Sequence, residues 1–300
     1  MNAALFVSTV LIWGTTWIAI ALQVGPVPII VSVFYRFALA GTVFLLGLAV
    51  LGRLRIPGRR HHPWLAAQAL CLFSLNFLFF YSAAAHIPTG LISVVFSLAT
   101  LFNALNARLF YGERISPRAL LACVIGVFGL ILLFGAEFSL DNATETLRGI
   151  GFAAAGTMMF SLGNMISRRN AAAGLSTVDA NAWAMGYGAL FLLICILGAR
   201  VQIIVPPDAA YVAALIYLSV IGSVVGFTTY LMMVARIGAS QAAYATVLFP
   251  IVALSISTFV EGYQWTWVKA LGVGLALCGN AVMFMRGWPL PLRRAGVRLS

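Results

Sequence analysis

Charged residues are scarce in this chain. Asp, Glu, Lys and Arg make up only 8% of its 300 residues, whereas soluble domains carry roughly 25%. Hydrophobic residues make up 62%, and a water-soluble core has no use for so much apolar surface. The shortage of charge excludes an ordinary soluble domain and predicts an all-α integral membrane protein with several transmembrane helices.

Acidic residues, histidines and cysteines are also few, at 7, 3 and 4. The close histidine pair His61–His62 lies beside Pro63 in a basic loop without metal-ligand spacing. No Gly-rich phosphate-binding motif is present, and no set of acids and nucleophiles gathers near one membrane face. We therefore expect no catalytic residue, metal or cofactor, and an integral-membrane enzyme is the less favoured alternative. The cysteines fit neither a zinc site nor a disulfide framework and are predicted to be small core residues: Cys71, Cys123, Cys195 and Cys278.

Ten apolar stretches have about the 20 residues that are needed to cross a bilayer. They are predicted at 3–22, 29–51, 64–85, 89–111, 117–135, 148–170, 178–198, 209–231, 240–261 and 267–286. The first stretch lacks a basic n-region and a clear cleavage site, so we interpret it as a retained span rather than a signal peptide.

The net charge of +11 is distributed as in a membrane protein rather than along a nucleic-acid-binding face. With the N-terminus inside, thirteen arginines lie on the inner side and three basic residues on the outer side. The inner ones are Arg53, Arg55, Arg59, Arg60, Arg114, Arg118, Arg168, Arg169, Arg236, Arg286, Arg293, Arg294 and Arg298, and the outer ones are Arg148, Arg200 and Lys269. We predict a multi-pass protein of the bacterial inner membrane with both termini cytoplasmic, surrounded by lipid and without a nucleic-acid partner.

A weak internal repeat is present at half length. Residues 81–134 align with 231–284 without a gap and with seven identities, and a basic residue before a tight turn recurs in register. The alternative to a true repeat is a helix bundle without internal symmetry, in which the two halves are similar by chance. Each half holds five spans, an odd number, so the halves are predicted to be inverted, an arrangement that places a transporter's substrate site between them. The predicted units are 1–147, 148–286 and a basic cytoplasmic tail at 287–300.

Four stretches in a fixed order carry a resemblance to a known family. They are IWGTTWIA at 12–19, YRF at 35–37, the stretch 89–116 that leads into a glycine-bearing helix, and its repeat at 239–266 with Pro250. Together they resemble EamA-type transporters of the drug/metabolite transporter superfamily over essentially the whole chain. The chain looks most like the bacterial YddG-type amino-acid exporter branch.

The resemblance implies a secondary transporter that exports small organic metabolites, among them amino acids including aromatic ones. It implies alternating access through a central cavity between the two repeats. Uptake or exchange of another metabolite, such as a nucleoside, an amine or a drug, is the alternative within transport. The chain departs from the family at Thr100, which stands where the second half has its proline, and at Glu261–Tyr263, which reverses the order of Tyr111–Glu113.

Trp13 and Trp17 are candidate cavity residues. They are four positions apart and therefore share one helix face, with Thr16 beside them. We predict an aromatic, partly polar wall for an organic solute. Packing of both rings between helices is the alternative.

Four further polar residues stand in apolar surroundings: Asn76, Tyr81, Asn164 and Tyr244. Buried amides and hydroxyls need partners, which a cavity, a substrate or a neighbouring helix can supply. We place all four near the cavity, with bonding between helices as the alternative role.

Arg36 is a charge about seven residues into the second span, roughly 10 Å deep at 1.5 Å per residue. It can extend outward to the membrane surface, or line the outer half of the cavity, where backbone carbonyls or an anionic solute would meet it. Its equivalent in the second half is Gly186. No acid lies in the middle of any span, and proton-coupled carriers commonly place one there. The sequence therefore favours a facilitator or a weakly coupled exporter.

Overall fold

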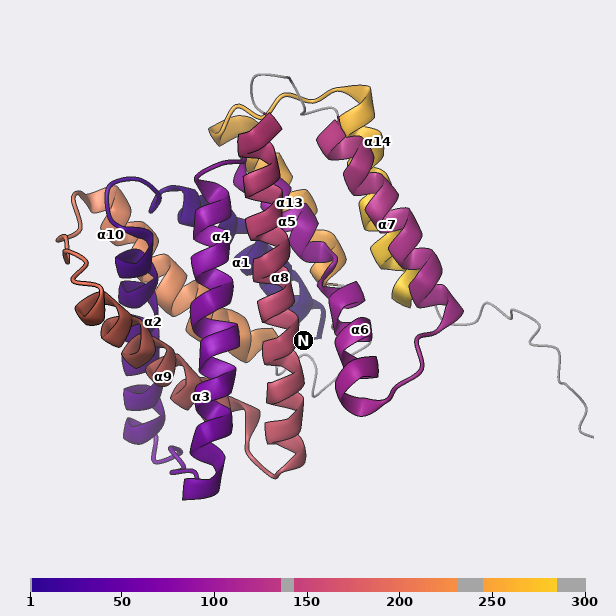
Figure 1. Cartoon of the computed structure of the whole chain (residues 1–300). Helices are drawn as coiled ribbons and strands as arrows, with labels where there is room; N and C mark the ends of the chain where they lie inside the picture. Colours follow the sequence, from indigo (N-terminus) through magenta and orange to yellow (C-terminus); the bar gives the residue numbers. More distant parts are fainter. Residues whose placement is uncertain (1, 136–142, 231–244, 285–300) are drawn as a thin grey trace, which may run out of the picture.

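The computed structural model describes residues 2–135, 143–230 and 245–284, and these residues contain helices and connections but no strand. The elements, shown in Figure 1, are α1 (Asn2–Ala21), α2 (Ile29–Val50), the 3₁₀ turn η1 (Arg59–His61), α3 (His62–Leu70), the π segment η2 (Cys71–Leu75), α4 (Asn76–Ala84), α5 (Thr89–Ser97), α6 (Ala99–Tyr111), α7 (Pro117–Gly135), α8 (Ala143–Ala172), α9 (Thr177–Gly198), α10 (Ala209–Ile216), the π segment η3 (Tyr217–Val225), α13 (Ala245–Val260) and α14 (Trp267–Phe284).

The described residues include eight helical stretches long and apolar enough to cross a membrane, and two shorter apolar helices at Leu248–Val260 and Trp267–Gly279. Large apolar side chains face outward, among them Phe259 at 88% and Trp267 at 91% exposed. Such a surface is unfavourable in water and favourable in lipid. The all-helical membrane fold is thereby confirmed. The expectation that the cysteines are core residues was wrong: Cys278 is exposed and the other three are only partly buried, as lipid contact allows.

Several predicted spans differ from the observed helices in their bounds. The third begins at Arg59, because Pro63 occupies the first turn of α3, where its missing N–H costs nothing. The sixth begins at Ala143, five residues earlier than predicted. The fourth is not one helix, since Leu98, with ψ of 2°, separates α5 from α6. The predicted positions 240–244 lie outside the described residues.

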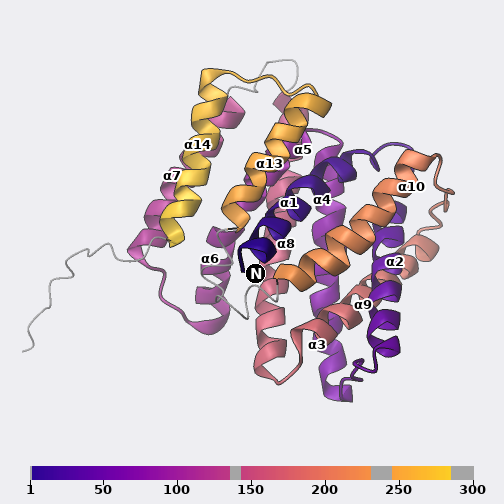
Figure 2. The ribbon, with the colours of Figure 1, turned by 180° about the vertical axis from the view of Figure 1, so that it is seen from behind.

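The helices α7 and α14 pack against each other at one end of the bundle, away from α2, α9 and α10 in both views (Figure 1, Figure 2). A Cβ placed on Gly272 would lie 2.6 Å from the backbone N of Leu133, and one on Gly279 would lie 2.7 Å from O of Ala122. The two backbones therefore touch, as small residues permit. Gly272 and Gly279 therefore serve packing within this chain.

Packing between the two halves of the chain comes in matched pairs. α1 packs on α13 as α5 and α6 pack on α8, and α3 packs on α9 as α2 packs on η3. The pairs α2–α9 and α7–α14 join equivalent helices directly. If each helix is replaced by its equivalent in the other half, every one of these contacts becomes another contact that is also observed. Two related repeats produce this pattern.

The two π segments also correspond between the halves. In each, a serine hydroxyl reaches the carbonyl five residues earlier: Ser74 Oγ lies 3.2 Å from Ala69 O, and Ser223 Oγ lies 2.9 Å from Leu218 O. A π turn widens a helix locally and is frequent at functional sites. Both segments border the pockets described next.

Candidate functional site

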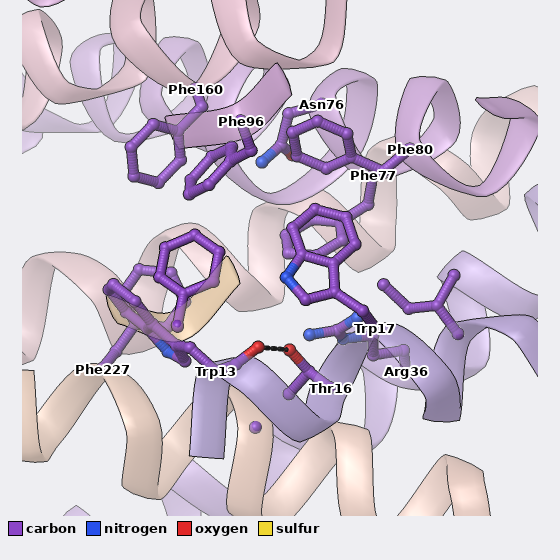
Figure 3. A pocket seen from close by; sticks show the side chains of 13 residues that line it. Trp13, Thr16, Trp17, Arg36, Asn76, Phe77, Phe80, Phe96, Phe160 and Phe227 are labelled. Carbon is purple, nitrogen blue, oxygen red and sulfur yellow. Dashed lines mark hydrogen bonds between the residues drawn. The ribbon is translucent and has the colours of Figure 1, made fainter. Parts of the chain in front are cut away.

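Side chains from both halves meet around a central cavity with an empty volume of about 500 Å³ (Figure 3). The lining residues are Trp13, Thr16, Trp17, Ile20, Arg36, Asn76, Phe77, Phe80, Phe96, Phe160, Gly222, Phe227 and Phe249. The helices α1, α2, α4 and α5 of the first half contribute to the wall, and so do α8, η3, Phe227 and α13 of the second half. The cavity therefore lies between the halves.

Aromatic rings form most of the cavity wall. Trp17 contacts Phe80 edge-on with ring centroids 5.3 Å apart and stacks on Phe249 at 6.5 Å. Trp13, one turn earlier on α1, contacts Phe227 at 5.6 Å and Tyr230 at 4.9 Å. Edge-to-face and offset contacts of this kind are favourable and hold rings in place. The result is a mainly apolar cavity walled by packed aromatic rings.

Two glycines at and after η3 let that segment approach α1. A Cβ on Gly222 would lie 2.8 Å from Cγ2 of Thr16, and one on Gly226 would lie 2.9 Å from Nε1 of Trp13. Any side chain at these positions would displace the α1 residues that face the cavity. The hydroxyl of Thr16 donates to the carbonyl of Trp13 at 2.7 Å, so it is already bonded within α1 (Figure 3).

Arg36 is buried at this cavity, with 2% of its surface exposed. Its Nε donates to Oγ of Ser223 at 3.3 Å, and its Nη1 has no hydrogen-bond partner. The guanidinium carbon lies 4.2 Å from the ring centroid of Phe77, a cation–π contact. None of the carboxylates in the described ranges forms an ion pair with it. The side chain does not extend to the surface, so the alternative of an outward extension to the membrane surface was wrong.

Polar side chains fill the space beside Arg36 outside the cavity. The hydroxyl of Tyr81, which is fully buried, donates to Oε1 of Gln23 at 2.7 Å and lies close to the Arg36 guanidinium. The hydroxyl of Tyr211 donates to Oγ of Ser32 at 2.7 Å, also in the interior. These bonds join α4 to the turn after α1, and α10 to α2.

A second pocket, with an empty volume of about 670 Å³, adjoins the first, since Trp13, Phe160 and Phe227 line both. Nδ2 of Asn164 on α8 faces Oδ1 of Asn103 on α6 at 3.4 Å within it. Uncharged polar groups provide much of its remaining surface: Thr100, Ser167, Thr177, Asn181 and Tyr230. The break at Leu98 brings the start of α6 to this pocket.

A third pocket, of about 1090 Å³, shares Thr100, Asn103 and Asn164 with the second. An ion pair stands at its rim, where Nη2 of Arg168 lies 2.6 Å from Oε1 of Glu113 and both side chains are about half exposed. Because neighbouring pockets share wall residues, the three pockets form a series in which each adjoins the next. The series leads from Arg36 to the ends of α6 and α8.

The residues predicted to line a cavity fall into four groups. Five line the aromatic cavity together: Trp13, Thr16, Trp17, Arg36 and Asn76. Tyr81 lies beside Arg36 and does not line the cavity. Its hydroxyl donates a hydrogen bond to Gln23 instead. Asn164 lines the second and third pockets instead. Tyr244 lies outside the described residues.

The sequence prediction missed the phenylalanines, which form most of the remaining wall: Phe77, Phe80, Phe96, Phe160, Phe227 and Phe249. Phenylalanine within an apolar span has the same appearance whether it faces lipid, another helix or a cavity. The spacing of Asn76 and Phe80, one turn apart on α4, is the local signal that one face of that helix lines the cavity.

A helical membrane fold with a cavity between two matched halves defines a class of multi-pass membrane proteins, and comparison with known proteins identifies the family. The chain matches the EamA-like transporter family twice, over residues 2–135 and 147–285. It belongs to that family.

Named relatives agree with this assignment. A probable terminal-alkyne amino-acid exporter of Streptantibioticus cattleyicolor is 24% identical, over 92% of this chain and 88% of the relative. The uncharacterized inner membrane transporter YedA of Escherichia coli K12 is 25% identical, over 94% and 90%. A probable amino-acid metabolite efflux pump of the same organism is 21% identical, over 93% of each chain. The protein is therefore a multi-pass inner-membrane transporter, and not an enzyme.

A solved crystal structure shares the fold. It superposes with a TM-score of 0.66 at 21% identity and covers 94% of this chain and 96% of its own. The family match confirms the resemblance to EamA-type transporters that the motifs indicated.

Proposed function

We propose that the protein exports small organic metabolites, namely amino acids including aromatic ones, by alternating access between its two halves. The observation that carries this proposal is the series of three pockets. An aromatic cavity with one buried arginine connects through uncharged amides and hydroxyls to a mouth at Glu113 and Arg168. The names of two relatives, an amino-acid exporter and an amino-acid metabolite efflux pump, support the same substrate class.

The proposal includes a topology of ten membrane helices with both termini cytoplasmic. The halves, 1–147 and 148–286, are inverted relative to each other, and the tail at 287–300 is cytoplasmic. Eight long apolar helices, two shorter ones and the matched packing between halves support it. In this orientation the mouth opens to the cytoplasm, and the bonds of Gln23, Tyr81 and Tyr211 close the outer side.

The cavity suits an amino acid whose side chain is planar and apolar. Rings such as those of Trp17 and Phe249 cover a planar group on its faces, while Arg36 and Asn76 offer polar contacts at the cavity wall. Thr16 and Trp13 complete this contact surface. Asn164 and Tyr81 act beside the cavity, on its two opposite sides.

Counterflow in proteoliposomes tests the proposal. Vesicles loaded with unlabelled L-phenylalanine should accelerate the entry of labelled L-phenylalanine, and vesicles loaded with a nucleoside or a polyamine should not. Trp17→Ala should reduce the rate at least about tenfold, since a large aromatic contact is lost. Trp267→Ala, on an exposed face of α14, is the matched control and should leave the rate unchanged. Exchange of nucleosides or amines without amino acids would refute the proposal.

A further inference from the structure

The cavity contains a positive charge that the protein itself does not neutralise. Arg36 is 2% exposed, donates a hydrogen bond to the neutral hydroxyl of Ser223, lies close to the neutral hydroxyl of Tyr81 and leaves Nη1 without a partner. A buried charge without a counter-charge is unfavourable. An anionic group that enters the cavity would supply both the missing charge and the missing acceptor.

The rest of the cavity wall carries no opposing charge. None of its lining residues is Asp, Glu or His. An acceptor without a partner is Oδ1 of Asn76, which is buried. This neutral oxygen can accept from an ammonium or a hydroxyl group of a ligand, but it cannot neutralise a cation.

The two polar contacts are therefore unequal. A hydrogen bond between charged partners is roughly twice as strong as one between neutral partners, and a guanidinium can hold a carboxylate through two parallel bonds. A ligand amine without a carboxylate would meet the like charge of Arg36 instead. The carboxylate of a ligand would therefore gain a stronger contact in this cavity than its amino group.

We propose that Arg36 recognises the carboxylate of the substrate, and that the cavity accepts aromatic monocarboxylates without an amino group as well as amino acids. The proposal deepens the proposed function and rests on it for the cavity as the transport site. It adds apolar organic acids as a further class of substrate. It also excludes aromatic amines, one of the alternatives that the sequence left open.

Three ligands with the same ring and chain test this proposal on the full-length protein in proteoliposomes: L-phenylalanine, 3-phenylpropanoate and 2-phenylethylamine. We expect 3-phenylpropanoate to compete with L-phenylalanine within about tenfold of its affinity. We expect 2-phenylethylamine to compete at least about tenfold more weakly than either, since it lacks the charged contact.

Variants of Arg36 test the contact itself. Arg36→Gln should weaken binding of both carboxylates at least about tenfold, and Arg36→Lys should retain part of the affinity because it keeps the charge. Arg108→Gln is the matched control, since Arg108 also lies within a span but is exposed and does not line a pocket of this series. The melting temperature in detergent reports whether each variant folds. If Arg36→Gln does not fold, the competition among the three ligands on the unsubstituted protein still tests whether the cavity prefers a carboxylate.

Failure of this proposal differs from failure of the proposed function. Transport of L-phenylalanine without binding of 3-phenylpropanoate overturns the carboxylate proposal and leaves amino-acid export intact. Binding and exchange of 3-phenylpropanoate without any amino acid supports the role of Arg36 and refutes amino-acid export. Equal competition by 2-phenylethylamine, or undiminished carboxylate binding in a folded Arg36→Gln protein, also overturns it.

Discussion

Ser223 connects the buried charge of Arg36 to a π turn. Its hydroxyl accepts a hydrogen bond from Nε of Arg36 at 3.3 Å and donates to the carbonyl of Leu218 at 2.9 Å. Because that carbonyl lies five residues earlier, the widened π turn determines where the hydroxyl points. The corresponding Ser74 instead lies 3.4 Å from the carbonyl of Gly188 on α9. The π-segment serine of the second half thus meets a charged side chain of the first half, whereas the π-segment serine of the first half meets only a backbone carbonyl of the second.

Replacement of Ser223 tests whether this bond orients Arg36. In Ser223→Ala the guanidinium loses an acceptor, so we expect carboxylate ligands to bind at least about tenfold more weakly, the effect of one hydrogen bond to a charged group. Binding of an uncharged ligand such as 3-phenylpropanol should not change. Ser255→Ala is the control, because Ser255 is exposed and bonds only the carbonyl of Ile251. An equal loss for charged and uncharged ligands would show a general disturbance of the cavity instead.

The sequence predicts the gross fold well for a physical reason. Each span is an apolar run of bilayer length, and that signal needs no tertiary information. The break at Leu98 and the two π segments were not predictable, because Leu98 has no proline or glycine beside it and the serines of the π segments are ordinary in a helix. Their geometry arises from packing against neighbouring helices.

The candidate site was predictable only where polarity or size stands out from the background. Trp13, Trp17, Arg36 and Asn76 are unusual within apolar spans and do line one cavity. The phenylalanine positions could not be separated from core or lipid-facing ones. For Arg36, the sequence left open an outward extension, because side-chain length alone permits it. Burial and the bond to Ser223 exclude that alternative.

A small residue at position 226 is predicted to keep the tryptophan wall in place. A Cβ there would lie 2.9 Å from Nε1 of Trp13, so Gly226→Ala must displace the indole. We expect a transport rate reduced at least about fivefold and a stability loss of about 1–3 kcal/mol, as for other overpacked sites. Gly47→Ala, in open space on α2, should change neither. Normal transport by Gly226→Ala would show that Trp13 does not contact the substrate.

The contact between α7 and α14 is predicted to be a main determinant of stability at its end of the bundle. Gly272→Leu would force a side chain against the backbone of Leu133, and we expect a clear fall of the melting temperature in detergent, corresponding to about 1–3 kcal/mol or more. Gly274→Leu, two residues away on the same helix, faces open space and should leave the melting temperature nearly unchanged. Equal melting temperatures for the two variants would contradict the close backbone contact.

The inverted topology predicts which loops face the cell exterior. Ile56, between α2 and α3, is 80% exposed, and Val205, between α9 and α10, is 78% exposed. In a protein whose four cysteines are replaced by alanine, Val205→Cys should react with a membrane-impermeant maleimide in intact cells. Ile56→Cys should react only after the cells are opened. The opposite result would reverse the orientation, and with it the direction in which the Glu113–Arg168 mouth opens.

Transport through this cavity is predicted to be independent of a proton gradient. Among the described residues, no Asp, Glu or His lines the aromatic cavity or the polar pocket next to it, so this part of the solute path has no group that titrates near neutral pH. Glu113, at the mouth, is paired with Arg168 and about half exposed. In proteoliposomes at fixed internal pH, an imposed gradient of one pH unit should change L-phenylalanine counterflow by less than about twofold, and Glu113→Gln should respond in the same way. Accumulation of L-phenylalanine against its own gradient, driven by the pH difference alone, would show that a proton does accompany the solute and that its carrier lies elsewhere in the chain.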